Sequence, residues 1–448
     1  MPKLLYDITS PQSLLDFAHG LSGKTLAEAV DLSHIIENIS NKGDLGNMVE
    51  KYYYHYRPDN TTHLPDFPEA GVELKTTGVL KRSDGSYRAK ERLVLTMINY
   101  LQLADEQWDT SSLMEKCRLM LILFYLYEKG VAVYDRRFVL NPLLFEFPAE
   151  DLKIIRRDWE TIRQKILDGK AHELSEGDTY YLGACRKGSG GVNEPLRHQP
   201  FSDTLAKSRA FSLKPTYVNR IIAGHASGAG LLKGSGKLTI EEATQDKFRP
   251  FLGKTVAEIS DMLSFHKKGK NDKGFYRNLT MRMLGTTKRS IPELEKAGVE
   301  VKTIRVGKNW APKEAMSFPA FSYIDIVNEE WEDSTFFAKI EQKFLLVVFR
   351  EYEPGAYRFE KVGYWNMPFA DREEAQRVWE ETKRRVAIDA SNLPKSTESF
   401  VAHVRPKGKN AQDKLPTPQG VMEPKKCFWL NKSYVGRTIT AIAVSMPY

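Results

Sequence analysis

An internal duplication is the feature of this sequence that most restricts its fold. Five short segments of the first half recur in the second half, in the same order and with a nearly constant offset. The matched pairs are 21–28 with 251–258, 42–43 with 273–274, 70–76 with 297–303, 185–188 with 404–407, and 211–214 with 428–431. One such match could arise by chance, but an ordered series hardly can, so we expect two domains of one fold.

A Gly/Ser-rich stretch, AGHASGAGLLKGSGK, separates the two copies and has the composition of a flexible connector. We therefore expect a first domain over residues 1–225, a linker over 226–247 and a second domain over 248–448. With 448 residues in all, each domain is long enough to bury a core of its own.

Within the first half, the hydrophobic pattern is mixed. Residues 14–30 and 151–167 carry apolar side chains at helical spacing, and Ser22 or Thr25 could cap a helix in the first of these stretches. Residues 72–75 alternate like a half-buried strand, while the continuous apolar run 119–124 suits a central strand. The expected class is mixed α/β, with a short mixed sheet flanked by helices in each domain.

Bulk composition restricts the partners and the compartment. The formal net charge of +8 favours an anionic partner without identifying it. Since no stretch approaches the roughly 18 apolar residues of a membrane helix, we expect no membrane partner. Asp7 interrupts what would be the apolar core of a secretion signal, so a cytoplasmic location is expected. The three widely spaced cysteines, Cys117, Cys185 and Cys427, are expected to be reduced and buried.

The stretch from Asp66 to Lys75 carries the most informative chemistry. Alternate residues of a strand share a face, so Glu73 and Lys75 point together, and Asp66 can meet them from the preceding turn. Two carboxylates form a hard oxygen site suited to Mg²⁺, and a nearby ammonium can orient a water and offset charge on a phosphate. The alternative is an exposed strand that bears an ion pair of little energetic value.

The neighbouring residues favour the first interpretation, because this sequence resembles the mismatch-repair endonuclease MutH and the two-domain restriction endonucleases that cut at GATC, members of the PD-(D/E)xK nucleases. The segments that carry the resemblance are LLDFAHGLSGKTLAE at 14–28, K-G-x-x-G-x-x-x-E at 42–50, D-x6-G-V-E-L-K-T at 66–76, Lys116-Cys117-Arg118, Arg186, and F-S-L-K at 211–214. The second half adds a fainter copy in the same order. The resemblance therefore implies two tandem restriction-endonuclease-like domains.

The resemblance also implies a role for each catalytic position. Asp66 and Glu73 would be the ligands of Mg²⁺, and Lys75 would position the attacking water. Glu50 would be a supporting acid near the metal, and Lys116 a second cation at the scissile phosphate. A helix-surface glutamate and a solvated lysine remain the alternatives for these last two.

Four further positions are implied to contact DNA. Lys42 matches a phosphate-binding lysine, with a solvated lysine as the alternative. Arg186 matches an arginine that reads guanine, chemistry natural to a bidentate guanidinium, although a phosphate clamp or a surface charge would also explain it. Ser212 stands where the repair enzyme has a tyrosine beside the adenine methyl group, which puts methyl discrimination in doubt. Lys214 keeps the cationic partner of that segment.

The second copy keeps part of the catalytic pattern, with Glu293, Glu300 and Lys302 at the same spacing. Met281 stands at the position that matches Glu50, the supporting acid, and Glu341 stands at the position that matches Lys116, the second cation. A glutamate at a position that faces a phosphate would repel the DNA backbone. We therefore expect a non-cutting, DNA-binding or allosteric second domain, with Arg405 and Lys407 as candidate DNA contacts.

These features together predict a type II restriction endonuclease that hydrolyses double-stranded DNA at GATC and leaves 5′-phosphate ends. With one active domain per chain, we expect a monomer in the absence of DNA and a dimer on the site. Two alternatives stay open: a methyl-directed nicking endonuclease of mismatch repair, which would need an activating partner, and a non-catalytic DNA-binding regulator. The duplication argues against the first, and the complete set of charged positions in the first copy argues against the second.

Overall fold

The chain folds into two compact units. The computed structural model describes residues 4–31, 44–56, 64–188, 196–224, 239–267, 269, 272, 274–288, 290–410 and 412–442. Unit 1 comprises Met1–Leu174, Thr179–Gly188 and Pro195–Gly228, and unit 2 comprises Ser175–Asp178, Ser189–Glu194 and Ala229–Tyr448. Part of the predicted linker 226–247 is helical, because Thr239 and Glu242 form a capping box that starts helix α8 (Ile240–Phe248).

Unit 1 contains a mixed four-stranded sheet in the order β2-β1-β4-β5. Strand β1 (Val72–Lys81) runs parallel to β4 (Leu119–Leu126), and the edge strands β2 (Tyr87–Ala89) and β5 (Leu143–Glu146) are antiparallel to them. The predicted strands 72–75 and 119–124 are thus confirmed. A second, antiparallel sheet has three strands in the order β3 (Leu93–Met97), β9 (Arg209–Leu213), β6 (Leu182–Arg186). A separate two-stranded sheet pairs β7 (Leu196–Gln199) with β8 (Ser202–Lys207).

The helices of unit 1 are α1 (Pro11–Ala18), α2 (Leu26–Ala29), α3 (Asp44–Met48), α4 (Tyr100–Asp105), α5 (Ser112–Cys117), α6 (Ala149–Leu167) and α7 (Pro215–Ile222). Helix α6 confirms the prediction for residues 151–167. The helical pattern over 14–30 belongs to two helices instead of one. Gly23 has a φ of 75°, which ends the first helical segment, and Thr25 then caps α2 in a reciprocal bond with Glu28.

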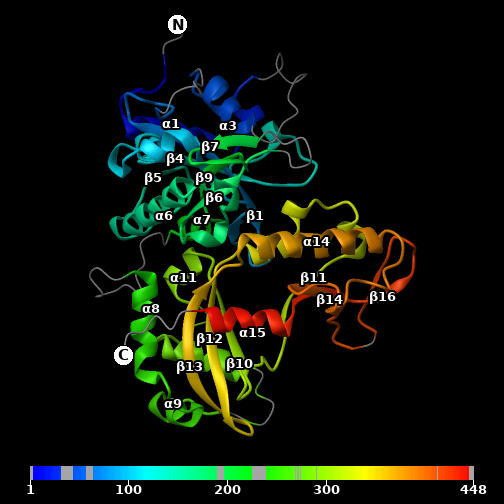
Figure 1. Cartoon of the computed structure of the whole chain (residues 1–448). Helices are drawn as coiled ribbons and strands as arrows, with labels where there is room; N and C mark the ends of the chain where they lie inside the picture. Colours follow the sequence, from blue (N-terminus) through cyan, green and yellow to red (C-terminus); the bar gives the residue numbers. More distant parts are fainter. Residues whose placement is uncertain are drawn as a thin grey trace. The chain divides into compact units, whose positions relative to one another are not determined.

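Unit 2 repeats this plan (Figure 1). Strand β10 (Glu300–Val306) is parallel to β12 (Phe344–Glu353), which pairs antiparallel with β13 (Ala356–Trp365). Strands β11 (Met316–Ala320), β17 (Lys426–Leu430) and β14 (Ala402–Pro406) form the antiparallel sheet, beside a β15 (Lys414–Pro416) and β16 (Met422–Pro424) pair. The other helices are α9 (Val256–Met262), α10 (Phe275–Met283), α11 (Pro292–Lys296), α12 (Tyr323–Ile326), α13 (Thr335–Ile340), α14 (Phe369–Val386) and α15 (Lys432–Ala441).

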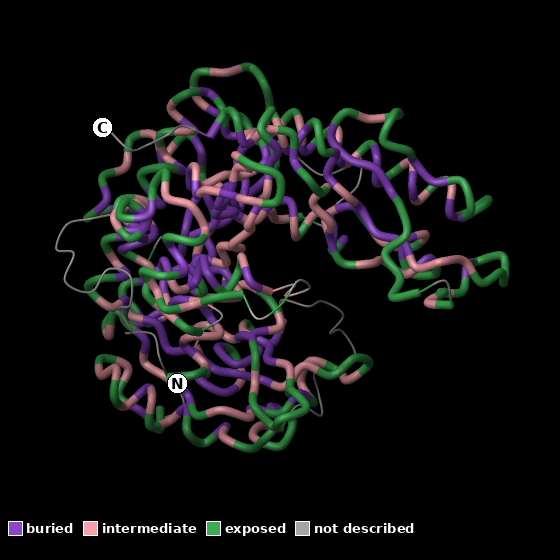
Figure 2. Tube along the Cα trace, turned by 90° about the horizontal axis from the view of Figure 1, so that it is seen from below, coloured by how far each residue is buried: buried purple, intermediate pink, exposed green. Residues whose placement is uncertain are grey.

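Each unit has its own apolar core. Figure 2 marks the buried positions in purple along the chain trace. The core of unit 1 contains side chains from α1, α3, β1 and β4. Val72 and Leu74 of β1 belong to this core, so apolar packing on that face of the sheet holds the parallel pair β1/β4 in place. The expected class, mixed α/β with two related units, is confirmed. Within the described ranges, the helices are all too short or too polar to cross a membrane.

Candidate active site

The turn before strand β1 brings the two predicted metal ligands together. The backbone N–H of Asp66 donates to Glu73 Oε2 at 3.0 Å, and the N–H of Leu74 donates to Asp66 Oδ2 at 2.9 Å. Phe67 anchors the turn, because its ring is fully buried and its N–H bonds to Val72 O at 2.9 Å. These reciprocal bonds hold both carboxylates at the start of β1.

Two lysines reach the same carboxylate from different elements. Lys75, two residues along β1, places its Nζ 2.6 Å from Glu73 Oε1. Lys116, in the last turn of α5, places its Nζ 3.6 Å from the same oxygen. Only 2% of Glu73 is exposed, so the alternative of a solvent-exposed strand with a surface ion pair is wrong.

Glu50 enters this cluster from a π-helical turn, Val49–Tyr53, that continues helix α3. The helix can approach β1 closely because Gly46 has no side chain. A Cβ at that position would lie 3.3 Å from Thr76 Oγ1 on the strand. The alternative of a surface glutamate is wrong for Glu50, which is buried, and its Oε2 has no hydrogen-bond partner among the residues that the structure describes.

The electrostatics of unit 1 indicate an excess of negative charge. Burial, together with the nearby Asp66 and Glu73, raises the pKa of Glu50 to about 8. Burial and Asp66 likewise raise the pKa of Glu73 to about 7, although Lys75 and Lys116 oppose the rise. Burial is the largest cause of both shifts and the nearby carboxylates add to it, so a bound cation would favour the ionised form of these groups.

The donor set fits a hard divalent cation. Mg²⁺ takes oxygen ligands, keeps several waters, and usually binds through one or two protein carboxylates. In the described parts of the chain, no group of three or more His, Cys, Asp or Glu side chains is placed so that it could hold a metal ion. The site instead offers two carboxylates, those of Asp66 and Glu73, with the buried Oε2 of Glu50 beside them. This arrangement agrees with the way Mg²⁺ binds through one or two carboxylates and several waters.

The predicted DNA contacts of unit 1 are more dispersed. Lys42 lies outside the described residues. Arg186 is the last residue of β6 and is half-buried. Ser212 is fully buried on β9, and Lys214 is buried with its Nζ donating to Thr179 O at 2.7 Å. The antiparallel sheet and the start of α7 enclose both side chains, and their contact with DNA stays a prediction.

The structure also corrects the comparison of Lys116 with Glu341. Helices α5 and α13 are both capped by a serine, Ser111 and Ser334, so Lys116 corresponds to Lys339. Lys339 Nζ lies 3.5 Å from Glu300 Oε2, which reproduces the contact between Lys116 and Glu73. The match with Glu341 failed because the spacing differs between the copies: one residue separates α5 from β4, whereas three residues separate α13 from β12. The matched Trp-x-x-Ser motifs at 108–111 and 331–334 were the sequence signal for the correct match.

Unit 2 carries the opposite charge balance. Lys302 Nζ lies 2.7 Å from Glu300 Oε1. Although burial opposes it, the pair Lys302 and Lys339 lowers the pKa of Glu300. Met281 is buried on α10 at the position of Glu50, so the supporting acid is missing from this copy.

Strand register corrects a second comparison. Phe211 pairs with Ala184 in unit 1, and Phe428 pairs with Val404 in unit 2. Arg405 therefore corresponds to Cys185 and not to Arg186, and a shift of one residue moves a side chain to the other face of a sheet. The exposed Arg405 stacks on Trp429 with its guanidinium carbon 3.8 Å from the ring centroid, and Lys407 Nζ donates to Phe318 O at 2.7 Å.

A mixed sheet that presents an acid from a turn and an acid and a lysine from the next strand defines the PD-(D/E)xK class of nucleases. The family model of the DNA mismatch repair enzyme MutH matches this chain in two stretches, residues 54–158 and 284–377. The type II restriction enzyme Sau3AI of Staphylococcus aureus is 32% identical over 89% of this chain and 92% of that protein. The chain belongs to the family of MutH-like type II restriction endonucleases.

Two further relatives bear on the duplication. MutH of Serratia proteamaculans is 25% identical and aligns 92% of its length with 48% of this chain. MutH of Shigella flexneri is 26% identical and aligns 96% of its length with 50% of this chain. A nearly complete MutH protein therefore corresponds to about half of this chain, in agreement with two related units.

Proposed function

We propose that this protein is a type II restriction endonuclease that cuts double-stranded DNA at GATC in the presence of Mg²⁺ and leaves 5′-phosphate ends. The observation that carries the proposal is the convergence of Glu50, Asp66 and Glu73 with two lysines in unit 1. Support for GATC comes from the similarity to Sau3AI. Unit 1, approximately residues 1–225, would be the cutting domain.

Each residue of the site has a task in this proposal. Asp66 and Glu73 would hold the metal, which would supply Lewis-acid stabilisation of the phosphate and a more acidic water. Lys75 stays protonated, because the neighbouring carboxylates raise its pKa despite its burial, and it would orient the attacking water. Lys116 would offset the charge that grows on the phosphate, and Glu50 would support the metal-bound waters.

Unit 2 would bind DNA without cutting it. Support comes from Met281, which supplies no acid at the position of Glu50, and from Glu300, which is already neutralised by two lysines. Lys339, and not Glu341, occupies the place that matches Lys116, so no repelling glutamate is expected there. Arg405, stacked on Trp429, is the strongest candidate contact on the sheet of this unit, whereas Lys407 is partly engaged by Phe318 O.

A cleavage assay with purified protein, unmodified GATC plasmid and magnesium tests the proposal. We expect linear fragments without any added partner. Nicking that requires repair proteins would favour the methyl-directed nickase, and retarded but intact DNA would favour the regulator.

The matched variants Lys75→Ala and Lys302→Ala test which unit cuts. Loss of one group that stabilises developing charge commonly lowers the rate by about 10²–10³-fold, so Lys75→Ala should lose cleavage. Lys302→Ala should still cleave when protein is in excess over DNA. Full activity of Lys75→Ala would reverse the assignment of the two units.

A further inference from the structure

Helix α10 of unit 2 differs from helix α3 of unit 1 at two positions that face the site. From the match of 42–43 with 273–274, Arg277 takes the place of Gly46 and Met281 that of Glu50. The burial patterns agree with this match, since 48–50 and 279–281 are buried in both copies, and each helix packs on the first strand of its sheet. One helix has therefore lost an acid and gained an arginine.

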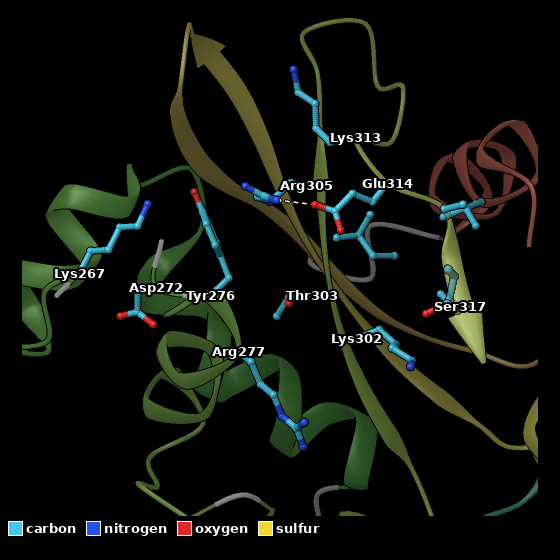
Figure 3. A pocket seen from close by; sticks show the side chains of 14 residues that line it. Lys267, Asp272, Tyr276, Arg277, Lys302, Thr303, Arg305, Lys313, Glu314 and Ser317 are labelled. Carbon is cyan, nitrogen blue, oxygen red and sulfur yellow. Dashed lines mark hydrogen bonds and ion pairs between the residues drawn. The ribbon is translucent and has the colours of Figure 1, made fainter. Parts of the chain in front are cut away.

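Arg277 lines a cavity together with Lys302, the lysine that pairs with Glu300. The cavity has a volume of about 630 Å³ and lies between α10, β10 and the segment that leads into β11. Figure 3 shows Arg277 and Tyr276 on the helix side and Lys302 and Arg305 on the strand side. Arg305 is paired with Glu314 at 2.7 Å, whereas Arg277 and Lys302 stand at the positions that match Gly46 and Lys75 of unit 1.

The net charges of the two sites differ by two units, which is the charge of one divalent cation. The unit 1 cluster, defined here as three carboxylates and two lysines, carries one net negative charge when every group is ionised, and contains Glu50, Asp66, Glu73, Lys75 and Lys116. The matching positions of unit 2, called here the unit 2 cluster, carry one net positive charge when every group is ionised, and are Arg277, Glu293, Glu300, Lys302 and Lys339. A divalent ion in unit 1 would give both clusters the same net charge.

We propose that the unit 2 cluster binds a backbone phosphate of double-stranded DNA without a metal ion, with Arg277 and Lys302 in the place that the cation takes in unit 1. This deepens the function proposed above and rests on it for the identity of the ligand. A guanidinium suits the task, because its planar donors match two phosphate oxygens. Glu300 competes with the phosphate for Lys302, and its shared pairing with Lys339 keeps both lysines directed toward the site.

Binding of a fluorescent GATC duplex to the full chain in EDTA, measured by anisotropy over a series of salt concentrations, tests the proposal. Arg277→Ala and Lys302→Ala should each weaken binding by about 3- to 10-fold and reduce the slope of log K against log salt by about one, as loss of one phosphate contact does. Arg249→Ala, which removes an exposed cation of the same unit outside this cavity, is the matched control.

Two more variants separate phosphate binding from loss of folding. Glu300→Gln removes the competing carboxylate and should strengthen binding in EDTA, which a destabilised protein would not do. Met281→Glu restores the acid of unit 1 and should weaken binding in EDTA and make it respond to Ca²⁺. Unchanged affinity and salt slope in both Arg277→Ala and Lys302→Ala would overturn the proposal.

Plasmid cleavage by the wild-type protein in Mg²⁺, run in parallel, distinguishes the two proposals. If the protein cuts GATC and these variants bind DNA normally in EDTA, the metal-free phosphate site is wrong and the proposed activity stands. If the protein does not cut but the variants lose affinity and salt slope, the phosphate site stands and the nuclease proposal fails.

Discussion

At the scale of residues, Glu73 and Glu300 show how neighbours decide what one side chain can do. Both stand at the start of the first strand of a mixed sheet, and both contact two lysines. Burial and Asp66 raise the pKa of Glu73 to about 7 against the effect of its two lysines, whereas Lys302 and Lys339 lower the pKa of Glu300 despite its burial. The same glutamate therefore favours a cation in unit 1 and is already compensated in unit 2.

Substitution of Glu50 provides a test of the excess negative charge in the metal-free protein. Its pKa is raised from 4.5 to about 8, so the folded state holds a proton that the unfolded state has lost. Stability from this group is present below about pH 4.5 and is lost as the pH rises through about 8. Glu50→Gln should therefore gain stability over the wild type in EDTA, by roughly 2–4 kcal/mol more at about pH 9 than at about pH 5.

Urea denaturation of both proteins in EDTA at the two pH values measures this difference. Glu300→Gln is the matched control and should change stability in the opposite direction, because a carboxyl with a lowered pKa stabilises the fold above its unfolded pKa. An equal effect of pH on Glu50→Gln and wild type would show that Glu50 is not crowded by other acids.

Lys214 illustrates what local sequence cannot reveal about a charged residue. The F-S-L-K segment predicted a cation at the DNA, but the structure places this lysine inside, beside the buried Asp158. Removal of one partner from a buried charged pair costs about 3–5 kcal/mol. Lys214→Met should therefore lower the unfolding free energy by that amount, while the folded protein keeps its salt dependence of DNA binding. A reduced salt slope without loss of stability would restore the original prediction.

At the scale of elements, the distance between α3 and β1 controls where Glu50 lies. A methyl group on Gly46 would meet Thr76 Oγ1 at 3.3 Å, so the helix or the threonine must shift. Alanine is favoured over glycine in helices by up to about 1 kcal/mol, and overall stability should change little. Gly46→Ala should nevertheless slow cleavage by roughly 10-fold, because a small misplacement of a supporting acid is costly.

The double variant Gly46→Ala/Thr76→Ala provides the control for this contact. It removes the threonine hydroxyl that the new methyl group meets and should recover most of the cleavage rate, measured in single turnovers. Failure to recover would mean that Gly46 matters for some reason other than the approach of the two elements.

The elements also show which predictions the sequence could support. Asp66, Glu73 and Lys75 lie within one turn and one strand, so their spacing alone predicted that they would meet. Lys116 could be matched only through the serine caps of α5 and α13, since helix and strand do not keep one offset between copies. Arg405 was matched to Arg186 one residue out of register for a similar reason, because sheet pairing, which the sequence does not state, sets the register.

At the scale of the whole molecule, the two units combine one fold with opposite charge balance. The proportions of the MutH relatives, each close to half of this chain, agree with two units descended from one pattern. If only unit 1 cuts, a single chain carries one cutting centre for the two strands of a palindromic site. A second chain or a second encounter must then supply the other cut.

The stoichiometry on DNA follows from this asymmetry and can be measured. We expect one chain per particle in sedimentation without DNA, and two chains per GATC duplex when Ca²⁺ replaces Mg²⁺. In an equal mixture of wild type and Lys75→Ala, about half of randomly formed pairs would contain one active unit 1, and these pairs would nick the plasmid without linearising it. Accumulation of nicked circles in proportion to the variant would support paired chains. Linear product that falls only with the dilution of the wild type would instead mean that one chain cuts both strands in succession.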